Sequence, residues 1–220
     1  MGDRALNFSR AHPDASPGYA AALAGLEQRL LRAQQVARTQ QDGINRRKAA
    51  NARKNQLSRQ MRKTQLRHLA RVAKVASRET TALNGKLVLR GAPRPFRSFR
   101  ALAGTMIAEA QLEKELLVKY GLADTVLDGL VESLDQFDRA ITESTDALRA
   151  HVSARAELDV LGDQVVDIVG VMDALNRFRF ADDPAVLAEW ETVSNVITPV
   201  PPADEPEVPP TSGGEIQPAA

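Results

Sequence analysis

The chain has 220 residues, of which 43% are hydrophobic but only 4% aromatic, and it contains no cysteine. The lack of cysteine excludes disulfides, thiolate metal sites and a cysteine nucleophile, and an apolar content dominated by Ala, Leu and Val is typical of helix–helix packing. The net charge of +1 conceals two opposite halves, because residues 1–100 carry 22 positive and 5 negative residues and residues 101–220 carry 7 and 23.

The N-terminal part of the chain changes character near residue 18. Residues 1–17 contain Pro13 and Pro17 and show no sustained hydrophobic period, so an irregular N-terminal arm is predicted. From Tyr19 the apolar residues recur at steps of three and four, which predicts a helix over about 18–42. Asp42-Gly43 interrupts it, since glycine costs about 1 kcal/mol inside a helix. Either a second helix follows over about 44–82, or one helix runs from about 18 to 80.

The most basic part of the chain is residues 45–78, which hold twelve positive and no negative residues. The remainder holds 17 positive and 28 negative residues, a net charge of −11. Up to residue 60 the charges point to all sides, whereas from Met61 onward a basic ridge lies opposite a face predicted to be buried. That face includes His68, Leu69, Val72 and Val75. The positive residues are Arg46, Arg47, Lys48, Arg53, Lys54, Arg59, Arg62, Lys63, Arg67, Arg71, Lys74 and Arg78.

Beyond the basic segment, glycine and proline mark the boundaries of further helices. Asn84-Gly85 is predicted to end the basic helix, and the following loop, which ends at Arg100, interleaves arginines with Phe96 and Phe99. Helical periodicity then predicts helices over about 100–120, 124–178 and 184–195, the last with Asp183 as N-cap and proline in its first position. Residues 199–220 hold seven of the twelve prolines, four acids and no Lys or Arg, which indicates a disordered acidic tail.

These elements predict an all-α fold. The two long helical regions, about 18–80 and 124–178, are similar in length, so we expect them to pair in an elongated, coiled-coil-like antiparallel bundle. The helix over 100–120 and the short helix carrying Trp190 would complete three- or four-helix packing over part of that length. We therefore expect a single helical domain over residues 18–198.

Two stretches carry a resemblance. The sequence Asn-Arg-Phe-Arg-Phe-Ala-Asp-Asp-Pro-Ala-Val-Leu-Ala-Glu-Trp at 176–190 and Lys-Tyr-Gly-Leu-Ala-Asp at 119–124 resemble a group of uncharacterised bacterial all-helical proteins, over about residues 17–198. The resemblance implies a helical fold in a bacterial setting and carries no implication about function.

Reactive groups do not converge in the sequence. A carboxylate-bridged di-metal site in a helical bundle needs Glu three residues before His, and none of His12, His68 and His151 has one. Because no glycine-rich phosphate loop or catalytic triad is recognisable either, we expect no enzyme, no catalytic residues, no metal and no cofactor. His68 is predicted to be a core or boundary residue and His151 a surface or seam residue. No segment is apolar enough for a membrane span, so a cytoplasmic location is expected.

The charge pattern supports two functional hypotheses. In the first, the protein is a non-enzymatic structural or interaction bundle whose partner is itself or another protein, and the basic helix is neutralised by the acidic half of the chain. Its acidic stripe would be Asp128, Glu132, Asp135, Glu143 and Asp146. In the second, the basic helix and loop bind nucleic acid through its phosphates, with Phe96 and Phe99 stacking on bases. We favour the first. The candidate contacts for either partner are Arg46, Arg47, Lys48, Arg53, Lys54, Arg59, Lys63, Arg67, Arg71, Lys74, Arg78, Arg94 and Arg97.

Overall fold

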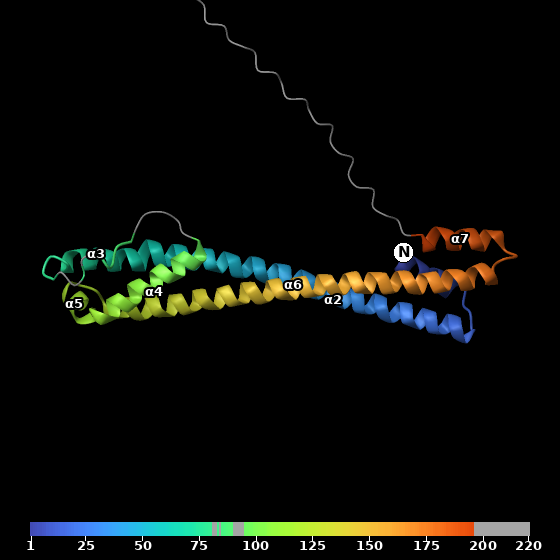
Figure 1. Ribbon diagram of the computed structural model, residues 1–220, viewed down its shortest axis with the longest axis horizontal. Helices are drawn as coiled ribbons and strands as arrows, with labels where there is room; N and C mark the ends of the chain where they lie inside the picture. The colour runs from blue at the N-terminus through green and yellow to red at the C-terminus, as the bar shows by residue number, and fades with distance from the viewer. Residues whose placement is uncertain (81–82, 84, 90–94, 196–220) are drawn as a thin grey trace, which may run out of the picture. The chain divides into compact units, whose positions relative to one another are not determined.

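The structure is a computed structural model that describes residues 1–80, 83, 85–89 and 95–195 (Figure 1). Within these ranges the chain is all-α, as predicted, and has no strand. The predicted acidic tail 199–220 and the predicted helix stop at Asn84 lie outside the described residues. The elements are α1 (Gly2–Ala11), α2 (Pro17–Gln60), η1 (Met61–Gln65, a π-helix), α3 (Leu66–Ala76), α4 (Phe96–Leu112), α5 (Lys114–Lys119), α6 (Asp124–Arg179) and α7 (Pro184–Ser194).

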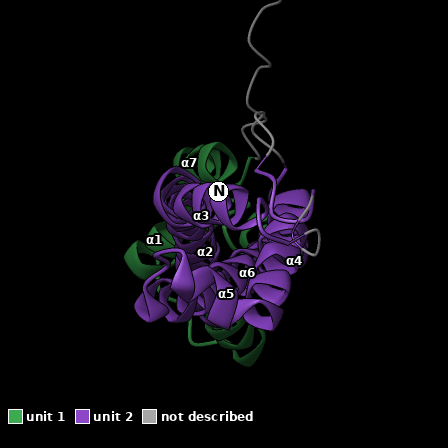
Figure 2. Cartoon of the chain, turned by 90° about the vertical axis from the view of Figure 1, so that its left-hand side faces the viewer, with its two compact units in different colours: residues 1–27, 165–220 green, residues 28–164 purple. Residues whose placement is uncertain are grey.

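The chain divides into two compact units, where the sequence predicted one helical domain over 18–198. Unit 1 comprises residues 1–27 and 165–220, and unit 2 comprises residues 28–164 (Figure 2). The two longest helices, α2 and α6, are each divided between the units, with one stretch in unit 1 and the rest in unit 2. A boundary inside a continuous helix leaves no signal in helical periodicity, so composition and spacing do not reveal it.

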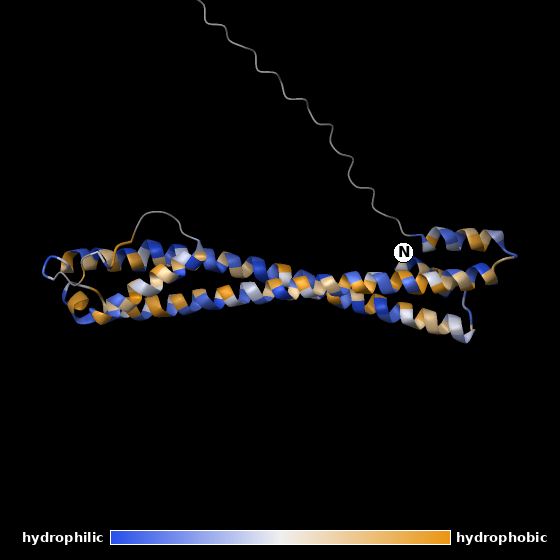
Figure 3. Ribbon diagram, viewed as in Figure 1, coloured by the Kyte–Doolittle hydropathy of each residue, from blue (hydrophilic) through white to orange (hydrophobic). Residues whose placement is uncertain are grey.

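In unit 2, α2 and α6 pack side by side in opposite directions, as predicted. Arg32 of α2 pairs with Glu157 at 2.7 Å, and further along α2 Arg53 donates a hydrogen bond to Gln136. As the residue number rises along α2, that of its neighbour on α6 falls, so the two helices are antiparallel. Figure 3 shows hydrophobic and hydrophilic residues alternating along both helices, as expected of helices that bury one face.

Of the two alternatives at Asp42-Gly43, the structure has the continuous helix, because α2 runs through these residues without a break. Gly43 lies against α6, where an added Cβ would come within 3.0 Å of the Ala147 carbonyl oxygen and 3.1 Å of the His151 backbone nitrogen. The glycine therefore allows close approach of two helix backbones instead of ending one. Small residues continue this seam, because Ala50 of α2 and Ala154 of α6 are also buried.

The regular α-helix is interrupted later, at η1. From Ala50 onward the buried residues follow one another at steps of three and four to Leu57 and Met61, but the next buried residue, Leu66, comes five positions later. The backbone N–H of Leu66 bonds the carbonyl of Met61, which is the five-residue hydrogen bond of a π-turn. The extra residue keeps Leu66 and Leu69 on the buried side, so η1 absorbs the shift in the hydrophobic pattern.

Unit 2 has a hydrophobic cluster beyond η1, which α3, α4, α5 and the first turns of α6 enclose. Phe99, Met106, Leu117 and Leu130 are among its buried members. The helix predicted over 100–120 begins earlier, at Phe96, and is divided at Glu113 into α4 and α5. The basic helix likewise ends at Ala76, earlier than the predicted 82. The predicted three- or four-helix packing is present here.

The prediction of an irregular arm over 1–17 is wrong, because this segment of unit 1 includes the helix α1. Its buried residues Ala5 and Phe8 pack against unit 1's other helices, and the Phe8 ring lies 5.1 Å from Trp190 and 6.0 Å from Phe180. A ten-residue helix has little stability of its own. Tertiary contacts with distant residues hold it, which local periodicity does not reveal.

The C-terminal helices follow the sequence prediction. α6 runs from Asp124 to Arg179, and α7 from Pro184 to Ser194. The Asp183 carboxylate accepts a hydrogen bond from the backbone N–H of Val186, as an N-cap does. Trp190 is fully buried and donates its indole N–H to Asp173 of α6 at 2.8 Å. This contact fixes α7 against the end of α6.

Candidate polyanion-binding surface

Most of the predicted contact residues lie on one continuous stretch of α2, η1 and α3. Ten of them are exposed, and together they are called the basic face below. Lys54 is buried and Arg62 is intermediate. Arg97 is exposed on α4, and Arg94 lies outside the described residues. The basic face consists of Arg46, Arg47, Lys48, Arg53, Arg59, Lys63, Arg67, Arg71, Lys74 and Arg78.

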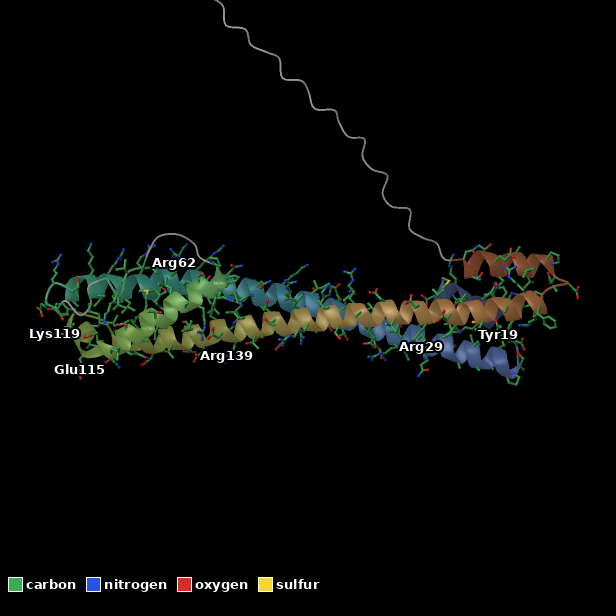
Figure 4. The ribbon with its side chains drawn as sticks, viewed as in Figure 1. Tyr19, Arg29, Arg62, Glu115, Lys119 and Arg139 are labelled. Carbon is green, nitrogen blue, oxygen red and sulfur yellow. The ribbon has the colours of Figure 1, made fainter. Side chains whose placement is uncertain are left out.

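The C-terminal part of the basic face is the most regular. Lys63, Arg67, Arg71, Lys74 and Arg78, called the basic row below, follow one another at steps of three and four residues. Residues at this spacing share one side of a helix. Nitrogen-tipped side chains project from the edge of α3, on the same side as the labelled Arg62, in Figure 4. The row thus presents five cations in line.

The basic face makes no close ion pair with the acidic half of the chain in the described ranges. No carboxylate oxygen there lies within 4.0 Å of a side-chain nitrogen of any of its ten residues. Arg53 bonds the neutral Gln136. The helices do run antiparallel, and Asp128, Glu132, Asp135, Glu143 and Asp146 are all exposed. Glu143 and Asp146 line one groove with Arg46 and Arg53, so the predicted internal match stays a prediction without direct ion pairs.

Three residues of the basic row line a cavity whose opposite wall is apolar. A cavity of about 590 Å³ lies between α3 and the segment that follows it. Arg67, Arg71 and Lys74 line one side of it, and Leu87 and Val88 line the other. Val88 is 49% exposed, so this wall is open to solvent. A partner lying along the basic row would meet both charge and an apolar surface.

The two phenylalanines predicted to stack on bases are not available for that role. Phe99 is 2% exposed and belongs to the core of unit 2. Phe96 is half-buried, packs edge-on against Phe137 and has the Lys54 ammonium 5.0 Å from its ring centroid. Recognition of unpaired bases by aromatic stacking therefore has little support, and contacts to a charged backbone fit this surface better.

The register shift at η1 also changes the positions of two predicted core residues. His68 is exposed and Val75 is 46% exposed. Both follow Met61 at heptad spacing, and the extra residue of η1 rotates that position away from the core. Leu69 and Val72 are buried as predicted. His151, predicted to be a surface or seam residue, has intermediate exposure and lies beside Gly43 at the contact of α2 with α6.

Metal-ligating side chains do not gather in the described part of the chain. Among those residues no three His, Asp or Glu side chains are placed to hold a metal ion together. None of the described helices is both long and apolar enough to cross a membrane.

Comparison of the chain with models of protein families, with curated proteins and with solved structures finds no match. Functional inference therefore depends on the surface itself.

Proposed function

We propose that the protein is a non-enzymatic helical interaction protein that binds nucleic acid through its basic face. The observation that carries the proposal is that the ten cations are exposed and that none has a carboxylate partner in the described ranges. Cations held by internal carboxylates would have to exchange partners on binding. Unpaired cations are available to phosphates at no such cost.

The extent of the face supports nucleic acid over a small anion. The segment from Arg46 to Arg78 contains no Asp or Glu, and at 1.5 Å per residue it covers roughly 50 Å. Duplex DNA carries one negative charge per about 1.7 Å of its axis. A long cationic strip suits a ligand of uniform charge. Because Phe99 is buried and Phe96 is half-buried against Phe137, phosphate contacts are favoured over base reading at this surface.

The experiment is a fluorescence-polarisation titration of a mixed-sequence DNA duplex at about 50 mM salt. The test variant changes the basic row, Lys63, Arg67, Arg71, Lys74 and Arg78, to Gln. A control with the same change in charge converts five arginines of unit 2 outside the basic face to Gln: Arg32, Arg38, Arg139, Arg149 and Arg155.

We expect micromolar binding by the unmodified chain, at least a hundredfold loss in the test variant and less than a tenfold loss in the control. The direction follows because each phosphate contact that is lost removes part of the counterion release that drives binding. Equal losses in both variants would mean that net charge alone drives binding. No binding by the unmodified chain would contradict the proposal.

Self-association is a second candidate, and one groove favours it. A cavity of about 670 Å³ in unit 2 is lined by Arg46 and Arg53 from α2 and by Glu143 and Asp146 from α6, above a floor of alanines. A two-fold axis would place each pair of arginines against the partner's pair of acids, as an isologous interface requires.

The test of self-association is a charge swap followed by sedimentation analysis. Changing Arg46 and Arg53 to Glu should dissociate a dimer, and adding Glu143→Arg and Asp146→Arg should restore it. A monomer at every concentration of the unmodified chain would remove this candidate.

A further inference from the structure

A second cationic site lies in unit 2, on α2, α4 and α6. It is a cavity of about 440 Å³, lined by Lys54, Phe96, Arg97, Arg100, Asp138 and Ile141. The volume is within the range of small-molecule sites in proteins, roughly 300–1,000 Å³. Lys54 is the only one of these residues that the basic segment contributes.

Lys54 is unusual because it is charged, buried and without a carboxylate. The residue is only 8% exposed, and no carboxylate oxygen of the described residues lies within 4.0 Å of its ammonium. Its contact is the face of Phe96, 5.0 Å away. Burying an unpaired charge is costly, and a cation–π contact compensates only in part. Burial, with the nearby charge of Arg47, lowers the pKa of Lys54.

The other charges of the cavity leave an excess of positive charge. Arg100 is held by Asp138, with its Nε 3.0 Å from Oδ1 and its Nη2 2.8 Å from Oδ2, so this pair is neutral. Arg97 is exposed and makes no ion pair with a described residue. Lys54 and Arg97 therefore contribute two cations that no described acid balances.

We propose that this cavity binds a phosphoryl group, with Lys54 and Arg97 as its cationic contacts. A lysine supplies a point charge and an arginine a planar fork of donors, and both suit phosphate oxygens. Phe96 and Ile141 form an apolar wall beside the cations, which suits the organic part of a phosphate ester. The ester is either a free small molecule or part of a nucleic acid. Only the second source rests on the proposed function.

The experiment follows the Lys54 side chain by NMR in protein labelled with ¹³C-lysine, titrated with adenosine monophosphate and separately with inorganic phosphate. We expect a saturable shift of the Lys54 ε-carbon signal below about 10 mM ligand and a rise in the pKa of Lys54, because a bound anion stabilises the ammonium. The matched control is Lys114, an exposed lysine of α5 that belongs neither to the cavity nor to the basic face, whose signal should not saturate.

Two variants make the test decisive. Lys54→Met and Arg97→Gln should each weaken binding of adenosine monophosphate at least tenfold, since each removes a charge-assisted contact, whereas Lys114→Met should leave it unchanged. Arg97 is exposed, so its variant tests the cavity without altering a buried residue. A linear, non-saturating shift, or an equal loss in Lys114→Met, would overturn the proposal.

Duplex binding by the Lys54→Met variant identifies the source of the phosphoryl group. A tenfold loss of duplex affinity together with the loss of adenosine monophosphate binding assigns the cavity to nucleic acid. Unchanged duplex affinity, or no duplex binding by the unmodified chain, assigns it to a free phosphate ester. In both cases saturable binding at Lys54 supports the cavity, and its absence contradicts it whatever the basic face binds.

Discussion

The two units differ in how many of their positively charged residues make internal contacts. Unit 1 contains four cations, all arginines, and every one is engaged. Arg4 bonds a backbone carbonyl, Arg10 pairs with Glu27, and Arg177 bridges Asp173 and Glu191. Arg179 donates to the carbonyls of both His12 and Pro13. In unit 2 the ten cations of the basic face have no described carboxylate partner.

The units also differ in how they are packed. Unit 1 is built on large side chains, with Phe8, Tyr19 and Trp190 in contact with its short helices. The α2–α6 pair of unit 2 instead relies on small residues such as Gly43 and Ala50, which let two backbones approach. The arginines of unit 1 thus make internal contacts, whereas the cations of the basic face in unit 2 make no ion pair with a described carboxylate.

The largest expected effect tests the role of arginine directly. Arg179→Gln removes two charge-assisted hydrogen bonds, an ion pair with Asp14 at 3.8 Å and a contact with the Phe180 ring. The side chain is partly exposed, so we expect a loss of about 2 kcal/mol in the free energy of unfolding. Arg71→Gln, in the basic face, should change it by less than about 0.5 kcal/mol. Urea titration of both variants measures the two free energies of unfolding. Equal losses of stability would contradict the difference described between the units.

A second change tests the close packing in unit 2. Gly43→Ala should destabilise by about 1–2 kcal/mol, although alanine is the better helix former, because its methyl group would press on the backbone of α6. Gly162 is the control, since an added Cβ meets nothing within 4 Å there. Gly162→Ala should stabilise by roughly 0.5–1 kcal/mol. Stabilisation by both substitutions in thermal denaturation would refute the role given to Gly43.

A smaller effect of opposite sign is expected at Lys54. Its pKa is lowered from 10.5, chiefly by burial, so the unfolded chain binds more protons between the lowered value and 10.5. Stability should therefore rise as pH increases through that window. Lys54→Met should gain up to about 1 kcal/mol at pH 7 and lose the rise. Urea midpoints at pH 7 and about pH 10 decide this, and a variant with the same rise as the parent would contradict it.

The smallest effect concerns acid stability in unit 1. The pKa of Asp14 is lowered from 3.8, first by a hydrogen bond from the backbone N–H of Ser16 and also by Arg179. A lowered carboxylate pKa contributes stability that is complete above the ordinary value and is lost as pH falls through the lowered one. Asp14→Asn should thus flatten the decline below about pH 4. An unchanged acid profile, followed by circular dichroism, would show that Asp14 contributes nothing.

Much of the fold follows from periodicity and local chemistry. Long runs of apolar residues at three- and four-residue steps predict α6 within one residue at its C-terminus, and the Asp183–Pro184 cap predicts α7. Gly121, which follows α5, has a φ of +94°, the left-handed conformation that favours glycine after a helix. These features are encoded within one or two turns, so the sequence alone is sufficient.

The errors arise where distant residues decide the outcome. Gly43 has the helix-breaking residue type, but its place opposite Ala147 becomes visible only when two helices are brought together. The same holds for α1, which depends on Trp190 and Phe180. A signal for η1 was present, since the five-residue step from Met61 to Leu66 departs from helical spacing. Applying it would have placed His68 and Val75 outside the core.

The sequence predicts where the basic face lies, but it does not predict which of its residues form ion pairs. Composition locates the basic face, whereas whether its charges meet Asp128 or Glu132 depends on helix rotation, which spacing alone leaves open. The cavity at Lys54 was missed because a lysine among eleven other cations gives no local sign of burial.

The salt dependence of duplex binding tests the central claim, that the basic row is free to neutralise phosphates, most directly. Five contacts predict that log K falls against log salt with a slope of about −4.5, using about −0.9 per phosphate. The measurement is a polarisation titration of the unmodified chain from about 50 to 200 mM salt. A slope of at least about −4.5, which loses about 4.5 when the basic row is changed to Gln, is the predicted result. Binding with a slope near zero, or a slope that survives those substitutions, would contradict the account.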